Sequence, residues 1–226
     1  MQRNRKDKLF PSQLEYSELV EIKEMIKPIL LKSSLLKNPT FLNANELTQG
    51  DREFLYEHFT TLSEMKELGP GQAFCLDETH SILISINFTD HICIHIIDTD
   101  SQWDASFSRL TELDKELAKH LHFAYSDQFG FLTADPGQCG TGLLIEPLLH
   151  LPLLLSDKKP VDIMHHVEDG IMLSSLSRNL NFTGDLGMIQ NIHTLGISED
   201  QILHLLHTNA LTLMNLEKEL QTKMAD

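Results

Sequence analysis

Cationic side chains are scarce in the middle of this 226-residue chain. Between Glu67 and Ser156 only three lysines or arginines occur, and all fall on one predicted helix: Arg109, Lys115 and Lys119. The whole chain has a formal net charge of −15 at pH 7. Because nucleic acids and anionic membranes are bound through basic faces, this charge balance argues against both as partners.

Long apolar runs and paired cysteines are also missing. The longest apolar stretch, residues 148–155, is interrupted by a histidine and a proline, and a membrane-spanning helix needs roughly 20 apolar residues. No hydrophobic segment follows the basic residues near the N-terminus, which argues against a secretory signal. Cys75, Cys93 and Cys139 show no CxxC spacing, so we expect reduced thiols and a cytoplasmic protein.

The first 70 residues are expected to form a small, mostly helical N-terminal part. Apolar residues at helical spacing predict a helix over residues 12–33, with a kink or an end near Pro28. A second helix is predicted over residues 45–62. The turn-forming residues within 65–72 indicate a linker.

Residues 71–226 are expected to form one α+β domain. The strand-like runs 81–86 and 91–97 predict an antiparallel pair. Ser198 and Gln201 form a capping box that predicts the start of a final helix about two dozen residues long. Between these elements we predict a helix ending near residue 120, a short strand at 129–132, a long apolar strand at 143–155, a helix at 160–168, an extended segment at 171–176 and a loop at 180–186.

Several short motifs follow one another in an order that is typical of one family. They are Asn87-x-x-Asp90-His91, Phe129-Gly-Phe-Leu-Thr133, Pro136, Gly140-Thr-Gly142, His150-Leu-Pro152 and the segment from Gly184 to Gly196. In this order they resemble the catalytic domain of the ATP:guanidino phosphotransferases, and most closely the bacterial protein arginine kinases. Arg3-Asn4 resembles the end of that family's Arg-x-Arg-x-x-Arg-Asn opening. The resemblance implies an antiparallel sheet flanked by helices.

At the positions where the resemblance places the chemistry, this chain departs from the family pattern. The family sequence Asn-Glu-Glu-Asp-His supplies a carboxylate to the substrate guanidinium. Its two acidic positions are Phe88 and Thr89 here, and neither side chain accepts a proton at neutral pH. Two positions that are arginines in the family are Cys93 and Leu144. Asp135 replaces a family cysteine and would add negative charge near the reacting centre.

We therefore expect no catalytic residues. Phosphoryl transfer depends mostly on positioning and on charge stabilisation, and a single arginine contact is worth about 10³–10⁵ in rate. No cofactor is expected, and Mg-ATP would bind only if the chain were active. The remaining motif positions are interpreted as a vestigial nucleotide-binding surface: Asn87, Asp90, His91, Cys93, Gly140, Thr141, Gly142 and Leu144.

The first functional hypothesis is a catalytically inactive relative, a pseudokinase, that acts as a protein-binding or regulatory module. The resemblance implies protein partners: an arginine kinase, its activator or Clp-type protease components. A homodimer is also open, because the final helix is apolar on more than one face.

Two alternatives stay open at this point. One is an active or partner-activated ATP-dependent protein arginine kinase with non-standard site residues. The other is a metal- or small-ligand-binding module, since His91, Cys93 and His95 share one face of a predicted strand. Cys139 would join them if its loop folds back as in the family. Histidines on such a strand are more often hydrogen-bonded filler, so we expect no metal.

Overall fold

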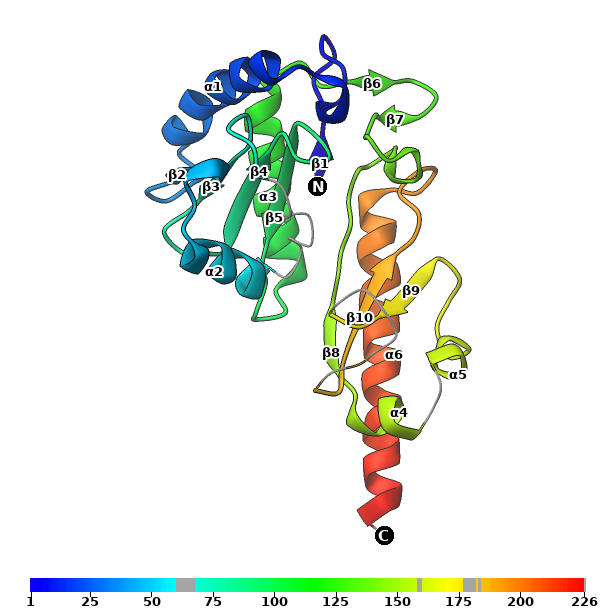
Figure 1. Cartoon of the computed structure of the whole chain (residues 1–226). Helices are drawn as coiled ribbons and strands as arrows, with labels where there is room; N and C mark the ends of the chain where they lie inside the picture. The colour runs from blue at the N-terminus through cyan, green and yellow to red at the C-terminus, as the bar shows by residue number, and fades with distance from the viewer. Residues whose placement is uncertain (60–67, 158–159, 177–181, 183, 226) are drawn as a thin grey trace. The chain divides into compact units, whose positions relative to one another are not determined.

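The computed structural model describes residues 1–59, 68–157, 160–176, 182 and 184–225. The chain divides into two compact units, Met1–Gly142 and Leu143–Asp226. Each unit combines helices with an antiparallel sheet (Figure 1), which confirms the predicted α+β class. Parts of the predicted helix over 45–62, of the linker over 65–72 and of the loop over 180–186 lie outside the described residues.

The first unit is built on a five-stranded antiparallel sheet with the order β1-β5-β4-β3-β2. The predicted pair of strands is confirmed as β4 and β5, with Ser85 opposite Cys93. β1, β2 and β3 were not predicted. The bounds are Gln2–Arg3 for β1, Thr40–Asn43 for β2, Ala73–Leu76 for β3, Ile82–Ile86 for β4 and Ile92–Ile96 for β5.

Helices supply the rest of the core of this unit. Leu55 and Phe59 of α2 pack in one buried cluster with Phe74 and Leu83 of the sheet. The helix predicted to end near residue 120 is confirmed as α3, and its leucine stripe is buried. The bounds are Pro11–Gln13 for η1, Tyr16–Lys32 for α1, Ala44–Glu46 for η2, Gln49–Phe59 for α2 and Trp103–Ala118 for α3.

The helix predicted over residues 12–33 is present as α1, and it continues through Pro28 to Lys32, so of the two alternatives there, a kink or an end, the end is wrong. A proline inside a helix costs about 3 kcal/mol, because it removes one backbone hydrogen bond and crowds the preceding turn. Ile26 and Leu30 on either side of it are fully buried. Burial of two such side chains contributes about 1.5–3 kcal/mol each, which is enough to hold this turn in the helix.

A small hairpin and a 3₁₀ turn complete the first unit. β6 and β7 pair antiparallel, with Tyr125 opposite Phe131. The strand predicted at 129–132 is therefore present, but only two residues long. The bounds are Tyr125–Ser126 for β6, Gly130–Phe131 for β7 and Pro136–Gln138 for η3.

The division between the units differs from the boundary predicted at residues 70 and 71. β1 and β2 both precede residue 70, yet they hydrogen-bond into the same sheet as β3, β4 and β5. The structure therefore keeps the N-terminal segment and the motif-bearing strands in one unit that ends at Gly142.

The second unit consists of a three-stranded antiparallel sheet, order β8-β10-β9, and a long helix. The capping box is confirmed: the Ser198 N–H donates to Gln201 Oε1 at 2.8 Å, and the Gln201 N–H donates to Ser198 Oγ at 3.3 Å. The bounds are Leu148–His150 for β8, Pro152–Asp157 for α4, Pro160–Met164 for α5, Ile171–Ser174 for β9, Leu186–Asn191 for β10 and Glu199–Ala225 for α6.

Of the long strand predicted over 143–155 only β8, Leu148–His150, is present, and the predicted extent is wrong because α4 begins at Pro152. Proline fits the first turn of a helix, where its missing N–H has no intrahelical acceptor to lose. The buried Glu217 carboxylate of α6 accepts the next two N–H groups, from Leu153 at 3.1 Å and Leu154 at 2.9 Å. A continuous apolar run does not by itself distinguish a strand from a buried helix.

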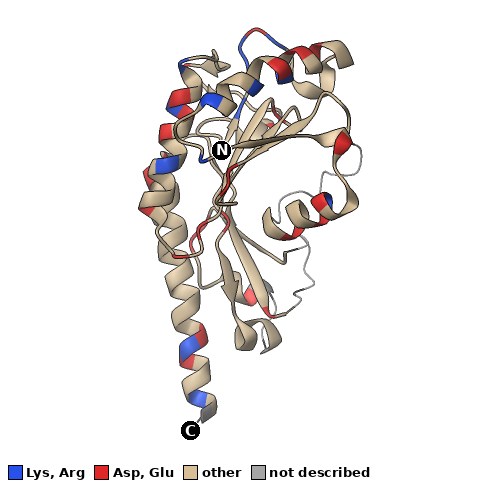
Figure 2. Cartoon of the chain, turned by 90° about the vertical axis from the view of Figure 1, so that its left-hand side faces the viewer, with Lys and Arg blue, Asp and Glu red and all other residues tan. Residues whose placement is uncertain are grey.

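Helix α6 has a long uncharged middle. Figure 2 shows no Lys, Arg, Asp or Glu over its central turns, in agreement with the sequence from 201 to 216. One side of this stretch is buried, while Leu211 and Met214 are exposed. None of the described helices is both long enough and apolar enough to cross a membrane.

Candidate functional site

The motif from Asn87 to His91 forms the tight turn between β4 and β5. Asn87 adopts a positive φ of 58°, a conformation that asparagine tolerates better than most residues. Its side-chain amide donates to the Leu19 carbonyl of α1 and to the Gly71 carbonyl, both at 2.8 Å. Asn87 therefore fastens helix α1 and the segment before β3 to the turn.

Asp90 connects this turn to two distant segments. Its Oδ1 accepts hydrogen bonds from the Asn4 side-chain amide and from the Ala134 N–H, the latter at 2.8 Å. The same Asn4 amide donates to the Leu132 carbonyl at 3.1 Å, and Asn4 Oδ1 accepts from the His91 N–H at 2.9 Å. Asn4 and Asp90 are both buried, so this junction holds the N-terminal segment, the turn and the 132–134 segment together.

His91 is fully buried at the same junction. Its Nδ1 accepts the Arg5 N–H at 3.2 Å, which places the proton of the neutral ring on Nε2. Burial disfavours the charged ring and, with the nearby positive charge of Arg5, lowers the pKa of His91 to about 4. At neutral pH this histidine is an uncharged packing residue.

The two positions that are acidic in the family pattern have different surroundings. Phe88 packs against the buried cluster beside α2, and its ring centroid lies 4.8 Å from that of Phe74. Thr89 is exposed at the tip of the turn. The first position is thus partly buried against the hydrophobic core.

Cys93 and His95 lie on β5 and are both half-buried. Cys93 faces Ser85 on one side and Gln2 of β1 on the other. His95 Nε2 lies 3.3 Å from Ser85 Oγ, within hydrogen-bonding distance.

The loop that follows β7 is closed by its own hydrogen bonds. Asp135 is exposed, and its Oδ1 accepts the Gly137 N–H at 2.9 Å. The Thr133 hydroxyl donates to the Asp135 carbonyl at 2.7 Å, and the Thr133 N–H points at Cys139 Sγ, 3.5 Å away. Asp135 therefore caps a local turn.

The Gly140-Thr-Gly142 segment packs directly against β1. The Gln2 N–H donates to the Gly142 carbonyl at 2.9 Å. Gly142 has a φ of 61°, and a Cβ added there would lie 2.8 Å from the Gln2 carbonyl oxygen. This close approach explains the glycine without reference to a phosphate.

The opening motif contributes one buried arginine, Arg3, which is only 1% exposed. Its guanidinium forms a bidentate ion pair with Asp114 of α3, in which Nε–Oδ1 and Nη2–Oδ2 both measure 2.9 Å. Nη1 donates to the carbonyls of Gln2 and Thr141 at 2.8 and 2.9 Å. The Phe131 ring centroid lies 3.7 Å from Cζ. Asp114 was missed by sequence reasoning, because nothing in its local pattern marks it as a partner of Arg3.

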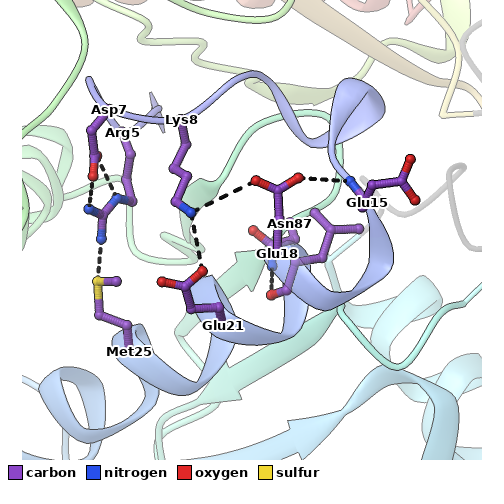
Figure 3. Close-up of polar contacts among 9 residues, drawn as sticks. Arg5, Asp7, Lys8, Glu15, Glu18, Glu21, Met25 and Asn87 are labelled. Atoms are coloured by element: carbon purple, nitrogen blue, oxygen red, sulfur yellow. Dashed lines mark hydrogen bonds and ion pairs between the residues drawn. The ribbon is translucent and has the colours of Figure 1, made fainter.

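The neighbouring cations are also paired (Figure 3). Arg5 Nε donates to Asp7 Oδ1 at 2.9 Å, and Lys8 Nζ lies 3.2 Å from Glu21 Oε2 and 3.9 Å from Glu18 Oε1. Arg3, Arg5 and Lys8 of the N-terminal segment are thus each paired with a carboxylate within the first unit.

The proposed metal ligands do not form a site in the part of the chain that the structure describes. There, no group of three or more His, Cys, Asp or Glu side chains could hold a metal ion. Cys93 and His95 lie on β5, whereas His91 lies in the turn before it, and Cys139 Sγ lies 3.5 Å from the Thr133 N. Leu144 belongs to the second unit and is half-buried.

The fold is that of guanidino kinases. The duplicated taurocyamine kinase from Schistosoma mansoni with bound transition state analog components matches 96% of this chain and 32% of its own, with a TM-score of 0.86 and 21% identity. A lombricine kinase structure matches 99% of this chain and 65% of its own, with a TM-score of 0.84 and 19% identity. These likenesses confirm the predicted antiparallel sheet flanked by helices.

Residues 21–220 match the family described as ATP:guanido phosphotransferase, C-terminal catalytic domain, and the chain belongs to that family. The protein-arginine kinase of Chlamydia pneumoniae is 32% identical over 175 residues, 77% of this chain and 49% of the relative. That of Chlamydia muridarum is 30% identical over 200 residues, 87% of this chain and 56% of the relative. The chain thus spans about half the length of these relatives, and the predicted resemblance is confirmed.

Replacing Asn4 tests the junction. Asn4→Ala removes one donor to the buried Asp90 carboxylate and the side-chain acceptor of the His91 N–H, so we expect a loss of about 2–4 kcal/mol in the free energy of unfolding, measured with urea. Gln128→Ala, which removes an exposed amide of the same unit, should change it by less than about 0.5 kcal/mol. Equal stability of the two variants would contradict the structural role of Asn4.

The lowered pKa of His91 predicts a pH dependence of stability. The unfolded chain takes up a proton near pH 6.5 and the folded chain only near pH 4, so this contribution is complete above pH 6.5 and is lost as the pH falls toward 4. Over that window the loss should approach about 3 kcal/mol.

Comparison with a variant separates this loss from that of the carboxylates. His91→Gln should show a smaller decrease in unfolding free energy between pH 6.5 and 4 than the parent chain, whereas His120→Gln, at an exposed position, should follow the parent. A His91 NMR titration midpoint near 6.5 would refute the assignment.

Proposed function

We propose that this chain is a catalytically inactive relative of the protein-arginine kinases that acts as a protein-binding or regulatory module. The observation that supports this proposal most is that the contacts of Arg3 are all structural. The arginine that matches the family's opening motif is buried, paired with Asp114 and hydrogen-bonded to two backbone carbonyls and to Met1 Sδ, so these contacts would have to break before it could bind a phosphate.

The electrostatics of the N-terminal segment support the same proposal. A triphosphate needs cations that face it, and one such contact is worth about 10³–10⁵ in rate. Arg3, Arg5 and Lys8 each have a carboxylate partner within 4 Å. For any of them to serve a nucleotide, it would have to leave that partner.

The carboxylates that would orient a substrate guanidinium are also missing from the β4–β5 turn or already engaged. Phe88 is turned toward the core, and Asp90, the carboxylate of the same turn, is buried and accepts hydrogen bonds from Asn4 and Ala134. A buried carboxylate that already accepts two hydrogen bonds is poorly placed to orient a substrate guanidinium. The motif residues that remain serve the architecture of the unit.

The family suggests the kind of partner. The relatives of known activity are named protein-arginine kinases, so a protein rather than a small guanidino compound is the natural associate. We include an arginine kinase, its activator and Clp-type protease components as partners to be tested.

An activity assay tests the inactive assignment. Incubated with Mg-ATP and an arginine-rich test protein, the chain should produce no phosphoarginine above background by ³¹P NMR, while a protein-arginine kinase run in parallel should. Mg-ATP should raise the melting temperature by less than about 1 °C, because a ligand that does not bind cannot stabilise. Phosphoarginine formation would establish the active alternative, and a rise with Zn²⁺ would favour the metal-binding one.

Restoring the acids of the family pattern gives a second test. Phe88→Glu places a carboxylate against the buried cluster and should lower the free energy of unfolding by about 2 kcal/mol or more. Thr89→Glu, at the exposed neighbouring position, should change it by less than about 0.5 kcal/mol. Neither variant should gain phosphoarginine formation. A Phe88→Glu chain as stable as the parent would mean that this position is still open to chemistry.

A further inference from the structure

A groove of about 920 Å³ on the first unit lies outside the motif site. It is lined by the segment after Asn4, by the C-terminal half of α3 and by the residues that follow that helix. Neither the β4–β5 turn nor the Gly140–Gly142 segment contributes to it. The residues that matter below are Lys6, Lys115, Ala118, His122, Phe123 and Phe131.

The acidic residues of the groove are already neutralised. Asp114 is paired with Arg3, and Asp7 with Arg5. The Arg5 guanidinium, by hydrogen bonding to the Asp7 carboxyl, lowers the pKa of that group below its ordinary value. Both carboxylates are thus satisfied from within the unit, and they add little negative charge to the groove.

The lysines of the groove are different. Lys6 and Lys115 are exposed, and among the described residues neither has a carboxylate within ion-pair distance, in contrast to Arg3, Arg5 and Lys8. With the acids compensated, these lysines give the groove a positive local charge on a chain whose net charge is −15. An exposed pair of uncompensated cations attracts an acidic ligand.

The floor of the groove is aromatic and rigid. The rings of Phe123 and Phe131 lie edge to face, 6.3 Å apart. The buried Arg3 guanidinium stacks on Phe131, so the ring is held from behind. Tyr125, which is 56% exposed, extends this surface, with its ring 5.3 Å from that of Phe131. A preformed apolar surface flanked by charges is typical of a docking site.

We propose that this groove docks an acidic peptide segment of a protein partner. An apolar side chain of that segment packs on Phe123 and Phe131, and its carboxylates face Lys6 and Lys115. Two lysines match a short acidic segment, whereas a nucleic acid needs a more extended basic face than this groove offers. The proposal rests on the protein-binding role proposed above and names the surface and the chemistry of the partner.

Fluorescence anisotropy with three labelled 12-residue peptides tests the charge requirement. The peptides share a central Trp-Leu pair and carry four Glu, four Gln or four Lys residues around it. We expect the Glu peptide to bind at least about 10-fold more tightly than the Gln peptide, the Lys peptide not to bind, and the difference to shrink with added salt. Equal binding of the Glu and Gln peptides, or no binding of either, overturns the proposal.

Charge-reversal variants locate the site. The double variant Lys6→Glu/Lys115→Glu should weaken binding of the Glu peptide about 10-fold or more. Lys119→Glu makes the same change at an exposed position of the same region that does not line the groove, and should weaken it less than about 2-fold. A Lys119→Glu effect as large as that of the double variant would mean that the peptide senses only the overall charge.

A groove-filling variant tests the floor without altering charge. Ala118 is exposed on α3, so Ala118→Trp should leave the melting temperature nearly unchanged while it weakens the Glu peptide about 10-fold or more. Undiminished binding would refute the assignment of the groove. A dimer that the double charge reversal abolishes would show that a second copy is the occupant, contrary to the proposal.

The two proposals fail in different ways. Phosphoarginine formation would refute the inactive assignment and leave peptide binding untouched, because the peptide assay contains no nucleotide. Equal binding across the peptide panel would refute the groove and leave the activity result as it stands.

Discussion

The first unit depends on one buried polar contact, between the Asn4 amide and the Asp90 carboxylate. A buried carboxylate without partners costs several kcal/mol, so the segments that supply its donors have to come together for the unit to form. Asn4 brings the N-terminal segment and Ala134 brings the segment after β7. The short strand β1, only two residues long, could not by itself hold the chain to the edge of the sheet.

This dependence explains why residues of the family motifs are still present although we propose that the phosphoryl-transfer activity is lost. Asn87, Asp90 and His91 each make contacts that keep α1, the turn and the N-terminal segment in place. Phe88 lies between them. It replaces an acidic residue of the family pattern with a ring that packs against the core, and it leaves those contacts intact. Within residues 87–91, the side chains that hold the fold together differ from those that the family uses for its reaction. The fold can therefore persist without the reaction.

The sequence was sufficient where the signal is local. Two neighbouring strand-like runs predicted β4 and β5, the leucine stripe predicted α3, and the capping box at Ser198 placed the start of α6. It was insufficient where a distant residue decides. The helix at Pro152 depends on Glu217, more than 60 residues away, and β1 and β2 are too short to leave a pattern.

For the candidate site, too, the sequence was sufficient for local motifs and insufficient for contacts between distant residues. Its residues were found from the order of motifs, and the structure brings most of them around β1 and the β4–β5 turn. Their partners were not found. Asp114 and Asn4 owe their importance to contacts with residues far along the chain, and the spacing of neighbouring residues contains no trace of such contacts.

The long reach of Arg3 has a consequence for how the protein is made. Its guanidinium binds Asp114 and the Thr141 carbonyl, 111 and 138 residues further along the chain. Contacts of such sequence separation form late, after the entropy of closing a large loop has been lost. Although β1 pairs with β5, Arg3 therefore cannot complete these contacts until the chain has been synthesised as far as Thr141. Until β1 has paired, the edge of β5 stands open to other chains.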